Sequence, residues 1–216
     1  MHRALLMCAL MGGLLGGTEA RAARHAPLGP SARNASGVVA HRAVNRAARW
    51  VGLPSLRRVS RAVNDDCSGF THLAYQRPGL SLMPEHTLPG ENGVAAIHRK
   101  ARSLHALRRY PRPGDLVFFR ETYDRNRDGR RNDGLTHIGV VERVERDGTV
   151  TFVHRAGGGV KRSKLNLYRP SLRRDAKGRV LNDYLRRTER RATHPRLAGE
   201  LLAGFATVDG RWLTVP

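Results

Sequence analysis

The most informative segment of the chain reads Asn64-Asp65-Asp66-Cys67-Ser68-Gly69-Phe70, where a carboxylate-rich turn leads into an apolar-periodic segment. The pattern predicts a helix that begins at Cys67 and ends before Pro78, because Asp65 or Asp66 can accept hydrogen bonds from its first free amides. A thiol in that first turn lies at the positive end of the helix dipole, beside amides that can bind an oxyanion. Cys67 is therefore a candidate nucleophile, held as a thiolate at neutral pH.

Two features of the same segment argue for an inert cysteine instead. A cysteine beside a helix cap is often a small buried packing residue, and two neighbouring carboxylates disfavour a thiolate. Position alone leaves both interpretations open. The pH dependence of alkylation separates them, since a catalytic thiol reacts well below the free thiol pKa of about 8.5.

The other cysteine, Cys8, lies in an N-terminal segment with the pattern of a secretory signal. Arg3 precedes an apolar run over residues 4–17, and Ala20-Arg21-Ala22 is a small-x-small cleavage site. The run is shorter than the roughly 20 residues that a membrane span needs. We therefore expect residues 1–22 to be a cleaved signal peptide, the mature chain to have no transmembrane segment, and the protein to be exported to the periplasm or the extracellular space.

The rest of the chain has the length of one domain. Residues 23–36 are small, polar and interrupted by Pro and Gly, which predicts a flexible leader with structure starting near Ser36. From there apolar residues recur at helical spacing up to Val51. We expect residues 37–216 to form a single catalytic domain, monomeric, with Cys67 as the only thiol of the mature chain.

The net charge of +21 comes almost wholly from arginine. Such a balance favours polyanionic surroundings. Nucleic acid is the less favoured polyanion, because the arginines are not interleaved with aromatic residues and no zinc-finger or helix-turn-helix spacing is present. Peptidoglycan or another anionic polymer of the bacterial envelope is the partner that we expect.

Three segments in the second half of the chain predict strands of one small sheet. The first follows a Pro-Gly turn, and the other two flank Asp147-Gly148, which indicates a hairpin. A helical pattern precedes them, and an apolar segment follows that can be a closing strand or a short helix. The expected fold class is α+β, with N-terminal helices packed on a small antiparallel sheet. In order, the segments are a helix over residues 94–104, strands over 115–119, 136–141 and 149–154, and the closing segment over 197–206.

The predicted hairpin carries two histidines, His137 and His154. Side chains alternate with period two, so any even-length loop places both on one face of the sheet. A two-residue loop would pair His154 with Val141, about 13 Å along the strand from His137. A longer turn or a bulge must bring the histidines together, and a loop over residues 143–148 would set them directly opposite.

Four motifs in this order resemble those of the NlpC-type cell-wall cysteine peptidases, a papain-like family related to the CHAP amidohydrolases and peptidases. The resemblance runs from about residue 43 to residue 165. It implies a papain-like fold and hydrolysis of amide bonds in the peptide part of bacterial peptidoglycan through a cysteinyl acyl-enzyme. The motifs are Asp66-Cys67-Ser68-Gly69-Phe70, Pro113-Gly114-Asp115-Leu116-Val117-Phe118-Phe119, His137-Ile138-Gly139 and His154.

The resemblance also implies roles for single residues. Cys67 is the nucleophile, His137 is the general base that then protonates the leaving amine, and His154 orients His137. An imidazole suits the base because its unperturbed pKa is about 6.5. Asp66 binds a substrate amine or serves only as a helix cap. The chain departs from the family at Ser55, which stands where a tyrosine helps the oxyanion hole, so only the Cys67 amide is assigned to that hole.

The segment before the base strand has oxygen-bearing side chains at alternating positions. Asp124, Asn126 and Asp128, followed by Gly129, match the first half of a calcium loop. Position twelve is Leu135 rather than a bidentate Glu, and four arginines within the loop would repel a dication. The hydrolase itself requires no cofactor. The sequence leaves open a Ca²⁺ site over residues 124–133 and a plain polar surface loop.

Two functions stay open at this point. The first is the exported cysteine hydrolase that the resemblance implies. The alternative is a noncatalytic cationic protein on the same fold that binds envelope polymers or nucleic acid, with an affinity that falls steeply with salt. The residues themselves do not distinguish an endopeptidase from an amidase or from an acyltransferase of similar fold.

Overall fold

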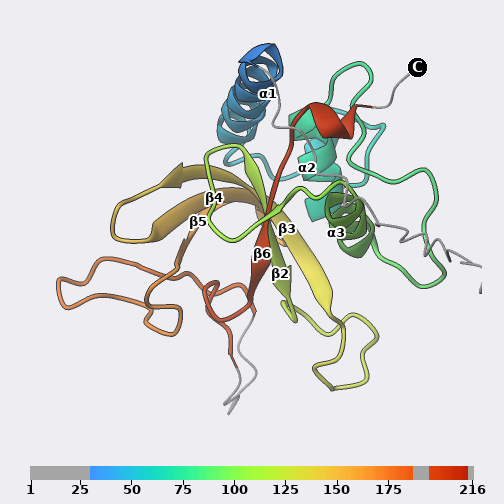
Figure 1. Cartoon of the computed structure of the whole chain (residues 1–216). Helices are drawn as coiled ribbons and strands as arrows, with labels where there is room; N and C mark the ends of the chain where they lie inside the picture. The colour runs from blue at the N-terminus through green and yellow to red at the C-terminus, as the bar shows by residue number, and fades with distance from the viewer. Residues whose placement is uncertain (1–29, 187–194, 214–216) are drawn as a thin grey trace, which may run out of the picture.

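A computed structural model describes residues 30–186 and 195–213 (Figure 1). The predicted signal peptide and residues 23–29 of the predicted leader lie outside the described residues. The first helix, α1, spans Pro30–Arg49, so the leader prediction was wrong for residues 30–36, which are helical. Pro30 stands at the first helical position, where the missing N–H of proline is not needed, and a proline there starts a helix rather than breaking one.

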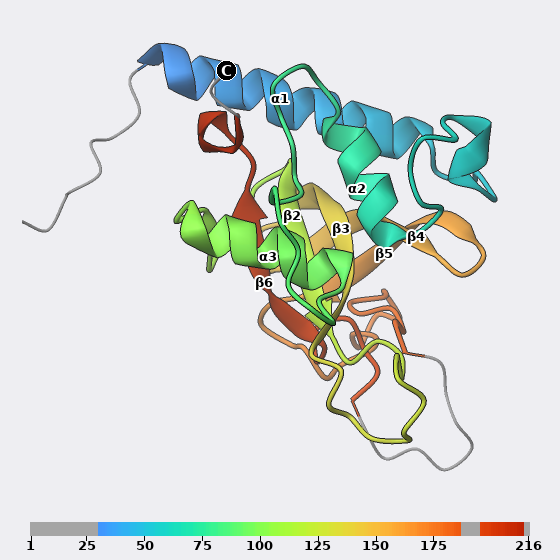
Figure 2. The same ribbon diagram turned by 90° about the vertical axis from the view of Figure 1, so that its right-hand side faces the viewer.

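Two further helices follow at the places that the sequence predicts. α2 spans Cys67–Tyr75 and α3 spans Gly93–Ser103. Short 3-10 helices lie at Leu56–Arg58 and Gly210–Trp212. Figure 2 shows α2 and α3 lying over one face of the sheet, with α1 crossing beside them. Within the described residues, no helix is both long enough and apolar enough to cross a membrane.

The sheet has six strands, all paired antiparallel, in the order β1-β6-β2-β3-β4-β5. The α+β class expected from the sequence is confirmed. The last strand inserts between β1 and β2, so the apolar segment near the C-terminus closes the sheet as a strand and not as a helix. The strands are β1 Leu107–Arg108, β2 Asp115–Arg120, β3 Leu135–Val144, β4 Thr149–Ala156, β5 Gly159–Asn166 and β6 Leu202–Thr207.

Both faces of the sheet are buried, each by a separate cluster of apolar side chains. Along β2, Leu116 and Phe118 belong to the cluster under the helices, whereas Val117 and Phe119 belong to the cluster on the opposite face. A strand buried on both faces reads as a continuous apolar run rather than an alternating one. Ala198 and Leu201, which precede β6, pack on the second face with the side chains of the strands.

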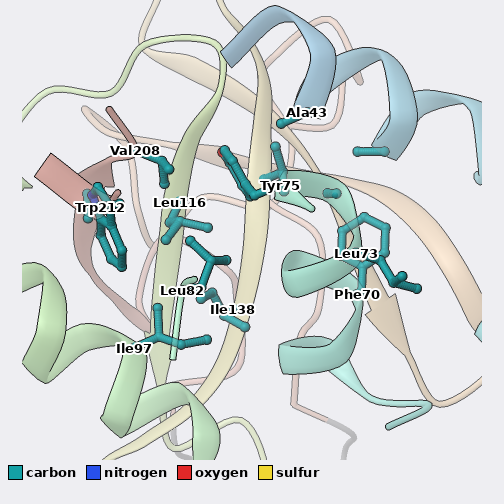
Figure 3. Close-up of a cluster of buried hydrophobic side chains, with 14 of the residues drawn as sticks. Ala43, Phe70, Leu73, Tyr75, Leu82, Ile97, Leu116, Ile138, Val208 and Trp212 are labelled. Atoms are coloured by element: carbon teal, nitrogen blue, oxygen red, sulfur yellow. The ribbon is translucent and has the colours of Figure 1, made fainter. Parts of the chain in front are cut away.

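The helix-side cluster fixes the position of α2 on the sheet (Figure 3). It joins Phe70 and Leu73 of α2 with Ile97 of α3 and Ile138 of β3, and each of these side chains is almost wholly buried. Burial of one such side chain contributes about 1.5–3 kcal/mol. The start of α2 is thereby held beside the middle of β3.

Candidate active site

The start of α2 is organised by its cap. Asp66 is the N-cap residue, and its Oδ1 accepts hydrogen bonds at 2.7 Å from the Gly69 amide and at 2.7 Å from the Ser68 hydroxyl. A Cβ on Gly69 would lie 2.0 Å from the carbonyl oxygen of Asn64, so only glycine fits where the turn packs on the helix. Cys67 is therefore the first residue of α2, as the sequence predicts.

Asp65, unlike Asp66, does not cap α2 but binds groups outside that helix. It accepts a hydrogen bond at 2.9 Å from the Leu56 amide, and it forms a two-pronged ion pair with Arg155 of β4, with Nε–Oδ1 and Nη2–Oδ2 distances of 2.9 Å and 3.1 Å. Hydrogen bonds from Arg155 and from the Leu56 amide hold the pKa of the Asp65 carboxyl well below its usual range. The pair ties the turn before α2 to the strand that carries His154.

The β3–β4 hairpin contains a bulge. Val141 pairs with Phe152, but Arg143 pairs with Thr151, so the register shifts between Val141 and Arg143. The prediction that a loop over residues 143–148 sets the two histidines directly opposite was wrong, because β3 continues to Val144 and the bulge changes the register within the strand. The more general expectation of a bulge or a longer turn is confirmed.

The observed register places His154 opposite Gly139, two residues from His137 on the same face. The two rings meet diagonally, with His137 Nε2 and His154 Nδ1 separated by 2.7 Å. A Cβ at position 139 would lie 2.8 Å from the Val153 carbonyl oxygen and 3.2 Å from the Cβ of His154. Glycine at 139 therefore allows β4 and His154 to lie this close to β3.

Aromatic rings surround the histidine pair and keep it uncharged. Phe119 and Phe152 both contact it, at ring-centroid distances of 6.2 Å from His137 and 5.0 Å from His154. Burial lowers the pKa of His137 to about 4. Burial also lowers the pKa of His154 well below its ordinary value, and the nearby His137 and Lys161 act in the same direction. Both rings are neutral at pH 7.

The environment of Cys67 also keeps it neutral. Burial raises the pKa of its thiol to about 11, and the charge of Asp66 acts in the same direction. The backbone amides of Ile138, Cys67 and Ser68 oppose this effect by hydrogen bonding to the sulfur. The expectation of a thiolate at neutral pH is not supported, because removal of the thiol from water outweighs the helix dipole and the amides together.

A single cavity of about 650 Å³ contains these groups. Cys67, His137 and His154 line it together with Asp66, so the structure gathers the four residues that the sequence assigned to catalysis and substrate binding. Asp65 and Asp124, named from the sequence as a candidate helix cap and a candidate calcium ligand, also line the cavity. The remaining side chains were not singled out from the sequence: Thr122, Tyr123, Thr136, Arg155, Lys161, Tyr184, Leu185 and Arg186.

Two of the additional residues have properties that suit a binding cleft. Burial and the proximity of Cys67 raise the pKa of Tyr123, so its hydroxyl stays a hydrogen-bond donor beside Cys67. Lys161 lies on β5, paired in register with His154, and is exposed. No local pattern marks either residue, since Tyr123 lies in a loop and β5 was not predicted as a strand.

The segment over residues 124–133 forms a compact loop at the margin of the cavity. Asp124 accepts a hydrogen bond from the Gly129 amide at 2.8 Å, and Asp128 accepts one from the Arg130 amide at 2.8 Å. Of the three ligands proposed from the sequence, Asp124 lines the cavity, whereas Asn126 and Asp128 are exposed. The loop is thus folded around its own carboxylates.

The chemistry of this loop does not decide whether it binds calcium. The second oxygen of Asp124 and one oxygen of Asp133 are buried without a hydrogen-bond partner, as oxygens that await a cation would be. Among the described residues, however, no three His, Cys, Asp or Glu side chains are grouped so that they could hold a metal ion. The calcium site stays a prediction.

The fold and the cavity together define a class of protein. A cysteine at the start of a helix, faced by a histidine on an antiparallel sheet with a second polar residue behind it, is the arrangement of papain-like cysteine hydrolases.

The family comparison agrees with this class. The model of the NlpC/P60 family matches residues 50–173, which is more than half of the chain and includes Cys67, His137 and His154. The chain belongs to the NlpC/P60 family, a family of cysteine peptidases and amidases. No curated protein and no solved structure matches the chain. The family resemblance drawn from the four motifs is confirmed.

Proposed function

We propose that the protein is an exported cysteine hydrolase that cleaves amide bonds in the peptide part of bacterial peptidoglycan. Membership of the NlpC/P60 family supports the class of reaction. The observation that carries the assignment of residues is the 2.7 Å contact between His137 Nε2 and His154 Nδ1, in the same cavity as Cys67. The three side chains then act as nucleophile, general base and orienting group.

The two nitrogen atoms that meet in the histidine contact support a particular proton path. Because Nε2 of His137 is engaged with His154, Nδ1 is the nitrogen that takes the thiol proton. The resting site holds a neutral thiol and a neutral imidazole. The proton therefore moves to Nδ1 as the sulfur attacks a bound carbonyl, which is general-base catalysis by a neutral pair.

The remaining steps follow from the same groups. Attack forms a bond between Sγ and the carbonyl carbon, and the oxygen takes the negative charge. The amides of Cys67 and Ser68 lie at the sulfur and can donate to that oxygen. His137 returns its proton to the leaving amine as the C–N bond breaks, which leaves a thioester. A water molecule activated by His137 then hydrolyses the thioester and regenerates the thiol.

The cleft offers groups for both ends of a peptide substrate. Asp66 is exposed beside the nucleophile, so its carboxylate can pair with a substrate amine while Oδ1 still caps α2. Lys161 is a cation suited to a substrate carboxylate. Arg155 is less available for this task because it is paired with Asp65.

Two further observations support action at the cell wall. NlpC/P60 proteins are commonly associated with the cell wall, and a net charge of +21 favours an anionic polymer as surroundings. The N-terminal pattern of a secretory signal supports export.

The test is digestion of purified peptidoglycan by protein that starts after residue 22, compared with its Cys67→Ala variant. We expect soluble peptide fragments from the first protein only, and mass spectrometry of these fragments identifies the bond. A cut between two amino acids identifies an endopeptidase, and release of the whole peptide from the sugar identifies an amidase. Equal melting temperatures of the two proteins show that the variant is folded.

The alternative function has its own signature in the same experiment. A folded protein that co-sediments with peptidoglycan in low salt, is released by high salt and yields no fragments is a cationic binding protein. That result would remove the hydrolase assignment for this polymer.

A further inference from the structure

The hydrogen-bonded pair of histidines continues to a third side chain. Ser163 lies on β5, where it pairs in register with Phe152 of β4. Its Oγ lies 3.1 Å from His154 Nε2, the ring nitrogen that does not contact His137. The side chains His137, His154 and Ser163 therefore form one chain of contacts across three neighbouring strands.

The chemistry of the reaction fixes the direction of these contacts. When His137 has taken the thiol proton, both of its nitrogens carry hydrogen, so Nε2 must donate to His154 Nδ1. A neutral His154 that accepts at Nδ1 carries its own proton on Nε2. That proton points at Ser163, and the serine hydroxyl must accept it.

We propose that Ser163 is a positioning residue of the active site, which holds His154 with its proton on Nε2 so that Nδ1 stays an acceptor for His137. Its effect on hydrolysis rests on the proposed function. The position of the proton on His154 is a property of the folded protein and can be measured without a substrate.

At the position of Ser163, an uncharged hydroxyl is a better hydrogen-bond acceptor for His154 than a carboxylate would be. His154 is buried, and its neighbours His137 and Lys161 both disfavour a positive charge on it. A carboxylate in place of Ser163 would favour a protonated His154, which has two N–H groups and can no longer accept from His137. A hydroxyl instead accepts one proton and leaves the ring neutral.

Without the hydroxyl, the buried Nε2–H would have no partner. An unsatisfied buried donor is destabilising by about 1–3 kcal/mol. While His137 is neutral, both rings can move their protons to the other nitrogen and avoid this loss, whereas a protonated His137 requires the proton of His154 to lie on Nε2. The loss therefore falls mainly on the state in which His137 is protonated. The expected effect is therefore on kcat rather than on KM.

The first measurement is the ¹⁵N NMR spectrum of the full-length mature protein labelled at histidine. We expect His154 at pH 7 to show a protonated Nε2 and an unprotonated Nδ1, and the Ser163→Ala variant to show a changed Nε2 resonance. A wild-type His154 with its proton on Nδ1 would overturn the proposal. So would a His154 spectrum that does not change in Ser163→Ala.

The second measurement is steady-state hydrolysis by three variants. We expect Ser163→Ala to lower kcat about tenfold, which corresponds to about 1.4 kcal/mol, with little change in KM. Ser163→Thr keeps a hydroxyl and should restore most of kcat. Lys164→Ala, at the next position of β5, is the control and should act like the wild type. Equal losses in the Ala and Thr variants would contradict a role of the hydroxyl.

Failure of this proposal differs from failure of the proposed function. If the wild-type protein cleaves no amide bond, the NMR measurement still decides whether Ser163 orients His154. If the wild type is active and Ser163→Ala is equally active, the hydrolase function is supported and the positioning role of Ser163 is disproved.

Discussion

The cleft has two walls: the helix wall, formed by the start of α2, and the strand wall, formed by β3 and β4. The first carries a carboxylate, whereas the second carries uncharged rings. On the helix wall, Asp66 is exposed, and it caps α2 with hydrogen bonds to its own first turn. On the strand wall, His137 and His154 are surrounded by aromatic rings and are neutral. Cys67 lies between the walls, and both keep it protonated: one by a neighbouring negative charge, the other by excluding water. Protons in this site therefore move only when a substrate provides a place for the charge.

Removal of the base from the strand wall should have the largest effect. His137→Ala is expected to lower kcat by about 10²–10⁴-fold, the usual contribution of a general acid–base group. The measurement is release of peptide fragments under saturating peptidoglycan. His72→Ala, on the same helix as Cys67 but outside the cavity, is the matched control. A His137→Ala protein that is folded and keeps wild-type kcat would disprove the assignment of the base.

Titration of the thiol tests whether the two walls keep it protonated. Because the pKa of Cys67 is raised to about 11, its alkylation rate by iodoacetamide should rise about tenfold per pH unit from neutral pH upward, without a plateau near 8.5. The thiolate fraction follows the pKa, so the rate reports it directly. A plateau reached below pH 8 would show instead that the site holds a thiolate. The criterion drawn from the sequence, that a catalytic Cys67 reacts well below pH 8.5, does not apply to this site, because a neutral thiol beside a general base can be catalytic with a raised pKa.

Removal of the Asp66 charge should make the Cys67 thiol more reactive and, at the same time, weaken the binding of substrates with a free amine. Asp66→Asn keeps a good N-cap side chain but removes the charge that raises the pKa of Cys67. We expect faster alkylation at pH 8 and, for substrates with a free amine, a fall in kcat/KM of about tenfold or more. N-acetylated substrate is the control, since it has no amine to lose. An unchanged preference for the free amine would remove Asp66 from substrate binding.

A methyl group added between β3 and β4 at position 139 should lower stability and kcat moderately. Gly139→Ala introduces a Cβ at 2.8 Å from the Val153 carbonyl oxygen, and such overpacking costs about 1–3 kcal/mol. We expect a lower melting temperature and a longer His137–His154 contact, hence a lower kcat. Gly210→Ala, where a Cβ would meet nothing within 4 Å, is the control. Equal melting temperatures and rates for both variants would contradict the role given to Gly139.

The smallest effect is expected at the loop beside the cleft. If Ca²⁺ binds residues 124–133, calcium at ten times its dissociation constant should stabilise the protein by about 1.4 kcal/mol, measured as a rise in melting temperature. Asp128→Asn should abolish the rise, whereas Asp175→Asn, the same charge change in another surface loop, should not. No heat in a calorimetric titration and no melting shift would end the calcium prediction.

The parts of the site that could be predicted from the sequence are those that depend on near neighbours. The capped start of α2, and Cys67 at its first position, follow from a few consecutive residues. The two histidine strands and their shared face follow from period-two alternation. The register between them could not be predicted, because the bulge near residue 142 depends on packing across strands.

The parts that sequence reasoning missed depend on distant residues. β5 has four consecutive polar residues at its centre, Lys161-Arg162-Ser163-Lys164, and little apolar signal, so neither the strand nor Ser163 was found. Arg155 follows His154 directly, but its partner Asp65 lies far away in the chain. The thiolate expectation failed for the same reason, since the burial that opposes it arises only when α2 packs into the helix-side cluster.

The ion pair between Asp65 and Arg155 joins two positions that are 90 residues apart. Cys67 follows Asp65 closely in the chain, and the proposed base His137 lies on β3, the strand beside the one that carries Arg155, so cysteine and histidine come together only when the helix and the sheet dock. On the proposed function, a newly made chain consequently carries no assembled active site, and folding itself is the step that makes the hydrolase active.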